Sequence, residues 1–173
     1  MNPDVLFDFD VDRENSTITV RREFAAKRQL VWDCHTQRDL LDRWFAPKPL
    51  TARTKHMDFR EGGHWHFAMV TPDGQSYWSR LDYVRITPID GYDAIDSFSD
   101  ETGAANPAMP QARWSVAFTE GAPRRTLVVT NVRYGSPADV EKVIAMGMKD
   151  GLTSTMQRLD ELLAALDSSA ARP

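Results

Sequence analysis

The stretch SPADVEKVIAMGMKDGLTSTMQRLDELLAAL, from Ser136 to Leu166, decides the fold of this chain. Apolar residues recur in it at steps of three and four, which is the spacing of one helical face. Ser136 and Pro137 suit the N-cap and the first helical position, and Asp139 completes a capping box. The pattern therefore predicts a single amphipathic helix of about eight turns with one buried face.

Two positions on the apolar face of this helix are glycines, Gly147 and Gly151. Each costs about 1 kcal/mol relative to alanine in a helix interior. Burial of the large apolar side chains on the same face contributes roughly 1.5–3 kcal/mol apiece, so the helix is expected to tolerate both glycines. Inward-facing glycines have two explanations: the backbone packs closely against a sheet, or space is left for a ligand. The sequence leaves both open.

The composition is that of one globular domain of 173 residues. The formal net charge of −4 argues against nucleic acid or an anionic membrane as the main partner. The single cysteine, Cys34, excludes an internal disulfide and favours a reducing compartment. Because the sequence shows neither a signal peptide nor a run of about 20 apolar residues, the protein is expected to be cytoplasmic.

The residues before the long helix predict an antiparallel sheet. Strand patterns separated by turn signals cover residues 16–24, 51–57, 63–71, 75–87, 92–99, 112–120 and 124–134. Two short helices are expected after the first strand, one over residues 27–36 and one that carries Leu40 to Phe45. Seven strands segregated from one long helix indicate an α+β fold.

The boundaries of the domain follow from the same patterns. Residues 16–166 are expected to form the folded domain, and residues 167–173 a disordered tail. Residues 1–15 alternate acidic and apolar side chains, so they could be an extra edge strand or an acidic arm.

Side-chain alternation assigns the faces of the strands. The side chains expected to point inward from residues 63–71, 75–87 and 112–120 are Trp65, Phe67, Met69, Tyr77, Ser79, Leu81, Tyr83, Trp114, Val116 and Phe118. Asp96 could also point inward with a perturbed pKa. We predict the outward, solvated position for it, because ionised aspartates are mostly exposed.

Two histidines, His64 and His66, have the strand spacing that could offer two metal ligands on one face. Alternation places them on the outer face of the sheet, and no third ligand is identifiable. We therefore predict solvent-exposed strand residues and no metal site. No catalytic motif and no cofactor-binding fingerprint is present either.

Five segments, in this order, resemble the heat-shock-protein-90 ATPase activator homologue-like proteins: ITVRREFAAKRQLVWD (Ile18–Asp33), DLLDRWFAP (Asp39–Pro47), DFREGGHWHFAMVTPDG (Asp58–Gly74), RTLVVTNV (Arg125–Val132) and GMKDGLTSTMQRLDELL (Gly147–Leu163). This family is part of the START-like superfamily, also called SRPBCC, which includes plant pollen allergens. The resemblance implies a helix-grip fold, in which a curved seven-stranded antiparallel sheet surrounds the C-terminal helix and leaves a cavity between them. Leu81 and Leu152 stand where the family commonly has glycine and tryptophan, and both changes alter the volume inside.

The leading functional prediction is a non-enzymatic domain that binds a small apolar molecule in this cavity. The residues predicted to line it are Trp44, Trp65, Phe67, Met69, Tyr77, Ser79, Tyr83, Gly147, Gly151 and Met156, with Tyr77, Ser79 and Tyr83 as the polar contacts.

Two other functions stay open. One is a co-chaperone-like interaction module that stimulates a heat-shock-protein-90-type ATPase, although such members usually carry an additional N-terminal domain. The other is a cyclase- or hydrolase-like enzyme that uses tyrosine, aspartate and arginine side chains of the same cavity for proton transfer. A homodimer could form through the loop from Asp100 to Gln111 and the outward-facing Trp78.

Overall fold

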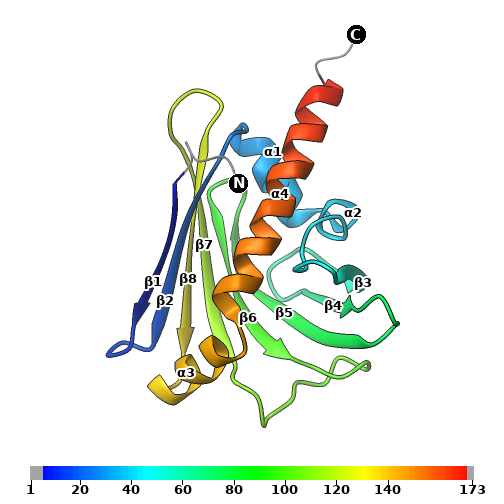
Figure 1. Ribbon diagram of the computed structural model, residues 1–173, viewed down its shortest axis with the longest axis vertical. Coiled ribbons are helices and arrows are strands. Elements are labelled where there is room, and N and C mark those ends of the chain that lie inside the picture. The colour runs from blue at the N-terminus through cyan, green and yellow to red at the C-terminus, as the bar shows by residue number, and fades with distance from the viewer. Residues whose placement is uncertain (1–5, 171–173) are drawn as a thin grey trace.

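The computed structural model describes residues 6–170, and these form one antiparallel sheet of eight strands with four helices (Figure 1). The strands lie in the order β1-β2-β8-β7-β6-β5-β4-β3. Their bounds are β1 Phe7–Asp12, β2 Thr17–Phe24, β3 Thr51–Met57, β4 His64–Val70, β5 Ser76–Thr87, β6 Gly91–Phe98, β7 Ala112–Glu120 and β8 Thr126–Tyr134.

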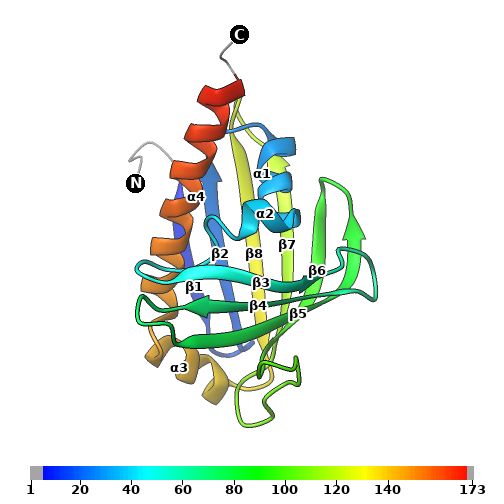
Figure 2. The ribbon, with the colours of Figure 1, turned by 90° about the vertical axis from the view of Figure 1, so that its right-hand side faces the viewer.

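The sheet curls around the helix α4 (Met148–Ala170). Figure 2 shows β3, β4 and β5 running crosswise to β2, β8 and β7, with α4 lying along the concave face. The short helices α1 (Arg28–Thr36) and α2 (Arg38–Leu41) flank the C-terminal half of α4. This arrangement confirms the predicted α+β helix-grip fold. No helix among the described residues combines the length and the apolarity needed to cross a membrane.

The eighth strand is β1, which forms from part of the segment 1–15. It pairs with β2 in antiparallel register, with Phe9 opposite Val20. Phe7, Phe9 and Val11 pack against the core cluster beneath β2, while the acidic residues between them face outward. The edge-strand interpretation is therefore right for residues 7–12, and the sheet has one strand more than the predicted seven. Residues 1–5 lie outside the described part of the chain.

The prediction of a single helix from Ser136 to Leu166 is wrong. The chain forms α3 (Pro137–Ala145) and α4, and the break between them falls at Gly147, whose φ of +89° is left-handed. A glycine just after a C-cap commonly ends a helix in this way, because it has no Cβ to oppose that conformation. The predicted start is confirmed, since Oγ of Ser136 accepts a hydrogen bond from the backbone N–H of Asp139 at 3.2 Å.

The far end of α4 also differs from the prediction. The helix continues to Ala170, into the segment 167–173 that the sequence predicts as a disordered tail. Residues 171–173 lie outside the described part of the chain.

A buried ion pair fixes α4 to the sheet. Arg22 points inward from β2, its side chain is fully buried, and it donates a hydrogen bond to the carboxylate of Asp160 on α4. The guanidinium also lies 4.7 Å from the centre of the Phe24 ring. Because a buried charge without a partner is costly, this pair constrains where α4 can sit.

Candidate functional site

A pocket of about 660 Å³ opens between the concave face of the sheet and the junction of α3 with α4. Strands β4 to β8 supply one wall, including Phe67, Leu81 and Trp114. The helices supply the other wall, including Gly151 and Leu152. The exposed side chains of Tyr77 and Met146 mark its mouth.

The two glycines leave this space open. A Cβ atom built at Gly147 or at Gly151 would meet no atom within 4 Å outside its immediate chain neighbours. Close packing of backbone against sheet therefore does not explain either glycine. Leu81 and Leu152, the two departures from the family pattern, both line the pocket and leave it unfilled.

Six of the ten predicted lining residues border the pocket. They are Phe67, Met69, Tyr77, Ser79, Gly147 and Gly151. Tyr77, predicted as an orienting contact, is at the mouth, and its hydroxyl lies 3.3 Å from Oε1 of Gln75.

The other four residues do not border the pocket: Trp44, Trp65 and Tyr83 belong to the packed core beneath α1 and α2, and Met156 packs against it. Trp44 and Trp65 are almost fully buried, and their indole N–H groups donate to the backbone oxygen of Cys34 at 2.8 Å and to Oγ1 of Thr54 at 2.9 Å. Tyr83 is buried among aromatic rings, and Met156 packs against the core clusters. Alternation correctly predicts that Trp65 and Tyr83 point inward from their strands, but it does not distinguish core from pocket.

Asp96 points into the pocket, so the prediction that it faces outward is wrong. It lies on β6 in a cross-strand row, with Leu81 on β5 to one side and Ala112 on β7 and Tyr134 on β8 to the other. A signal for this existed in the sequence, because Asp96 shares its strand face with Ala94 and Phe98. Tyr134 and Trp114 also border the pocket and were not among the predicted site residues.

The surroundings of Asp96 disfavour its charge. Burial raises the pKa of its carboxyl to about 7, and the neighbouring indole N–H of Trp114 acts in the opposite direction. That N–H is buried and has no hydrogen-bond partner of ordinary geometry, so it offsets only part of the rise. Among the described residues that line the pocket there is no lysine, arginine or histidine, and Asp96 is the one charged side chain.

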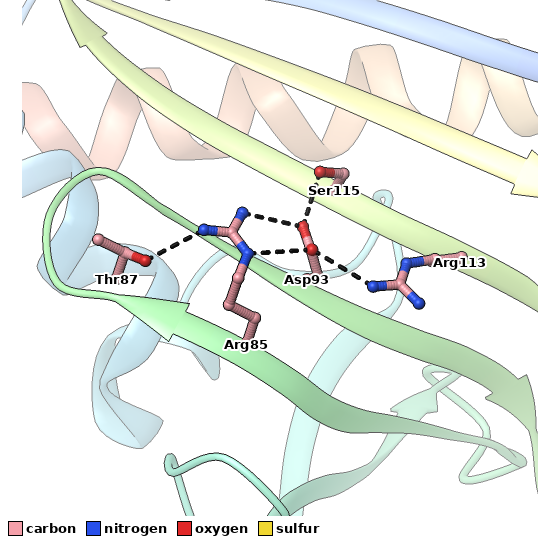
Figure 3. A network of polar contacts seen from close by, with 5 residues as sticks. All are labelled: Arg85, Thr87, Asp93, Arg113 and Ser115. Atoms are coloured by element: carbon pink, nitrogen blue, oxygen red, sulfur yellow. Dashed lines mark hydrogen bonds and ion pairs between the residues drawn. The ribbon is translucent and has the colours of Figure 1, made fainter.

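Asp93, on the same strand, faces the opposite side of the sheet (Figure 3). Its carboxylate accepts hydrogen bonds from Oγ of Ser115 at 2.7 Å, from Nε of Arg85 at 3.2 Å and from Arg113 at 3.4 Å. Burial alone would raise the pKa of Asp93, but these contacts and the charge of Arg85 outweigh it and hold the pKa below its usual range. The convex face thus carries a fully paired carboxylate, whereas the concave face carries an unpaired one.

The histidines do not form a site in the described part of the chain. His66 is buried rather than solvent-exposed, because the loop after β6 covers it, and its Nε2 lies 3.0 Å from the backbone oxygen of Asp100. His35 is buried in α1, its Nδ1 lies 2.7 Å from the backbone oxygen of Val31, and burial lowers its pKa to about 4. Within residues 6–170 no three His, Cys, Asp or Glu side chains gather closely enough to hold a metal ion.

Known structures share this architecture over nearly their whole length. A crystal structure of a protein from Mycobacterium smegmatis is 26% identical, has a TM-score of 0.83, and aligns over 92% of this chain and 96% of that one. A solution structure of a protein from Arthrobacter aurescens is 25% identical, with a TM-score of 0.85 and 91% of each chain covered. A protein from Nitrosomonas europaea, at 23% identity and a TM-score of 0.72, shares the fold.

No curated protein matches the chain in sequence. A family model does: the one described as Activator of Hsp90 ATPase homolog 1-like protein matches residues 25–164, which is most of the chain. The matched range runs from the end of β2 to the C-terminal half of α4, and so includes every strand and helix that borders the pocket. The chain therefore belongs to the family of Activator of Hsp90 ATPase homolog 1-like proteins.

Proposed function

We propose that this protein binds a small, mainly apolar molecule in the pocket between α4 and the sheet. The observation that carries the proposal is the pocket itself, which measures about 660 Å³ and is walled largely by apolar and aromatic side chains. Pockets that hold small molecules commonly have volumes of roughly 300–1,000 Å³ and linings of this kind.

Rigid packing behind one wall supports a pre-formed site. The ring of Phe67 stacks on that of Trp65, with centroids 3.8 Å apart. The indole of Trp65 donates to Thr54, whose hydroxyl in turn donates to Oδ1 of Asp42 at 2.6 Å. A wall fixed in this way loses little conformational entropy when a ligand binds, and this favours affinity.

Binding can be tested with the neutral fluorophore N-phenyl-1-naphthylamine and by native mass spectrometry of the purified protein for a bound small molecule. The fluorophore should bind the wild type at a single saturable site and brighten as it leaves water. The variant Gly151→Trp should abolish this signal, because the indole would occupy the open space beside α4.

The matched control is Gln157→Trp, which adds the same side chain at an exposed position of α4. It should bind the fluorophore like the wild type. Undiminished binding by a folded Gly151→Trp variant would place the ligand elsewhere and overturn the proposal. If Gly151→Trp unfolds, Gly151→Leu replaces it in the test. Normal fluorophore binding by Gly151→Leu would also count against the proposal.

A second candidate function, proton-transfer catalysis, is favoured by one observation. Asp96 faces the pocket with a pKa near 7, which suits a general acid or base at neutral pH. If the protein is an enzyme of this kind, a molecule that copurifies with the Asp96→Asn variant should be chemically converted by the wild type. An unchanged mass after incubation with wild-type protein would argue for binding alone.

The family name suggests a third activity, stimulation of a heat-shock-protein-90-type ATPase. An ATPase assay with purified chaperone separates this activity from ligand binding. Stimulation that persists in Gly151→Trp would show a chaperone-directed surface that is independent of the pocket.

A further inference from the structure

Among the described residues, the lining of the pocket has one carboxyl group, that of Asp96, and no other ionisable acid or base except phenols. This asymmetry indicates which charge the ligand carries. We propose that the ligand is an apolar molecule with one basic nitrogen, whose ammonium group pairs with the carboxylate of Asp96. The inference rests on the proposed function, since it assigns a chemical class to the occupant of the same pocket.

The first argument is the missing counter-ion. Two other carboxylates that are largely removed from solvent have a guanidinium within the chain: Asp93 has Arg85 and Arg113, and Asp160 has Arg22. Asp96 forms no ion pair within residues 6–168, and its neighbours in the cross-strand row, Leu81 and Ala112, are apolar. A carboxylate enclosed by apolar groups is unfavourable unless a cation reaches it, and here the open side of the carboxyl is the pocket.

The second argument is the character of the surrounding rings. Phe67, Trp114 and Tyr134 contribute aromatic side chains to the same pocket. Aromatic faces attract ammonium groups through their quadrupole, most strongly where water is excluded. One carboxylate with several rings is thus a lining suited to an amine attached to an apolar body.

A bound metal ion fits the lining less well. A metal site needs several ligands, and within the described residues no cluster of His, Cys, Asp or Glu side chains provides them. A neutral ligand that accepts a hydrogen bond from protonated Asp96 is the remaining alternative, and the experiment below distinguishes it from an amine.

Three probes of nearly equal size and different charge test the proposal: 4-phenylbutylamine, 4-phenylbutanol and 4-phenylbutanoate. Each is titrated against the protein loaded with N-phenyl-1-naphthylamine, and displacement of the fluorophore gives its affinity. Near pH 8.5 the wild type should bind the amine on the order of tenfold more tightly than the alcohol, and the carboxylate most weakly.

Two variants assign this preference to one carboxyl. Asp96→Asn keeps the shape of the side chain and should bind the amine and the alcohol equally. Asp93→Asn removes a charge from the same strand but from the other face of the sheet, so it should keep the wild-type preference.

The preference should also depend on pH. It should grow from about pH 5.5 to about pH 8.5, because Asp96 loses its proton in this range while a primary alkylamine stays protonated. The other titratable groups near the carboxyl are phenols, Tyr92 on β6 and Tyr134 on β8, with Tyr77 on β5 at the mouth. Burial raises the pKa values of Tyr92 and Tyr134, so both stay neutral throughout.

The outcomes separate this inference from the proposed function. If the fluorophore binds but the amine and the alcohol displace it equally at high pH, the amine proposal is wrong and the ligand-binding function stands. The amine proposal is also wrong if Asp96→Asn keeps the preference. If the fluorophore does not bind the wild type and no probe does so by calorimetry, both proposals fail together.

Discussion

Asp93 and Asp96 lie on the same strand, β6, yet their carboxyl groups face opposite sides of the sheet. Asp93 is paired with two guanidinium groups and a hydroxyl on the convex face, and these contacts hold its pKa below the usual range despite burial. Asp96 lies in the pocket without a cation among the described residues, and burial raises its pKa. One strand thus carries a structural carboxylate and a carboxylate that is available to a ligand.

The stability of the wild type should fall with rising pH because of Asp96. Its folded-state pKa is raised from 3.8 to about 7, so between these values the folded state holds a proton that the unfolded state has released. Relative to Asp96→Asn, the wild type should lose on the order of 1–4 kcal/mol of unfolding free energy between about pH 4 and about pH 8. Urea unfolding followed by tryptophan fluorescence measures both curves.

Asp93→Asn is the control for this measurement and should retain the wild-type slope above about pH 5, where Asp93 is ionised in both the folded and the unfolded state. Parallel curves for the wild type and Asp96→Asn would show that Asp96 does not titrate abnormally.

Stability should rise with pH because of His35, at lower pH and opposite in sign to the effect of Asp96. Burial lowers its pKa from 6.5 to about 4, so between these values the unfolded state binds a proton that the folded state does not. The contribution of His35 to stability is therefore complete above about pH 6.5 and is lost as the pH falls toward 4. In His35→Asn, which can still donate to the backbone oxygen of Val31, this part of the acid destabilisation should disappear.

The test for His35 is urea unfolding at several pH values between 4 and 7. If the unfolding free energy of His35→Asn falls with decreasing pH as steeply as that of the wild type, groups other than His35 cause the acid destabilisation.

The two glycines near the break between α3 and α4 should respond oppositely to alanine. Gly151 lies within α4 with open space around its missing Cβ, so Gly151→Ala should stabilise the protein by up to about 1 kcal/mol. Gly147 has a φ of +89°, which disfavours a residue with a Cβ, so Gly147→Ala should destabilise the protein by roughly 1–2 kcal/mol. Thermal and urea unfolding measure the sign of the stability change in each variant. Stabilisation by Gly147→Ala as well as by Gly151→Ala would contradict the helix break at Gly147.

The buried pair of Arg22 and Asp160 should be a major contributor to the docking of α4. Arg22→Met leaves Asp160 without its partner and should cost about 3 kcal/mol. Lys48→Met removes one side of an exposed pair with Glu161 and should cost less than about 0.5 kcal/mol.

A double-mutant cycle with Asp160→Asn isolates the interaction of Arg22 with Asp160. If the two single changes add without coupling, the pair does not hold the helix.

Much of the architecture follows from periodicity alone. The seven predicted strands match β2 to β8 to within a few residues, because turn residues separate them and most show the alternation of a strand with one face in the core. Ser136 and Asp139 fixed the start of α3 for a local reason, since the capping interaction joins residues three apart. These features need no knowledge of distant parts of the chain.

The sequence by itself determined the fold class, the family and the inward position of Gly151. Only the tertiary structure decided that Trp44 and Trp65 fill the core while Phe67 and Trp114 border a pocket, and that the helix breaks at Gly147. It also decided that no cation among the described residues lines the pocket beside Asp96. The physical reason is that alternation records which face of an element is buried, whereas the curvature of the sheet and the distance to α4 set whether that face meets protein or empty space. Those quantities arise from contacts between residues far apart in the chain.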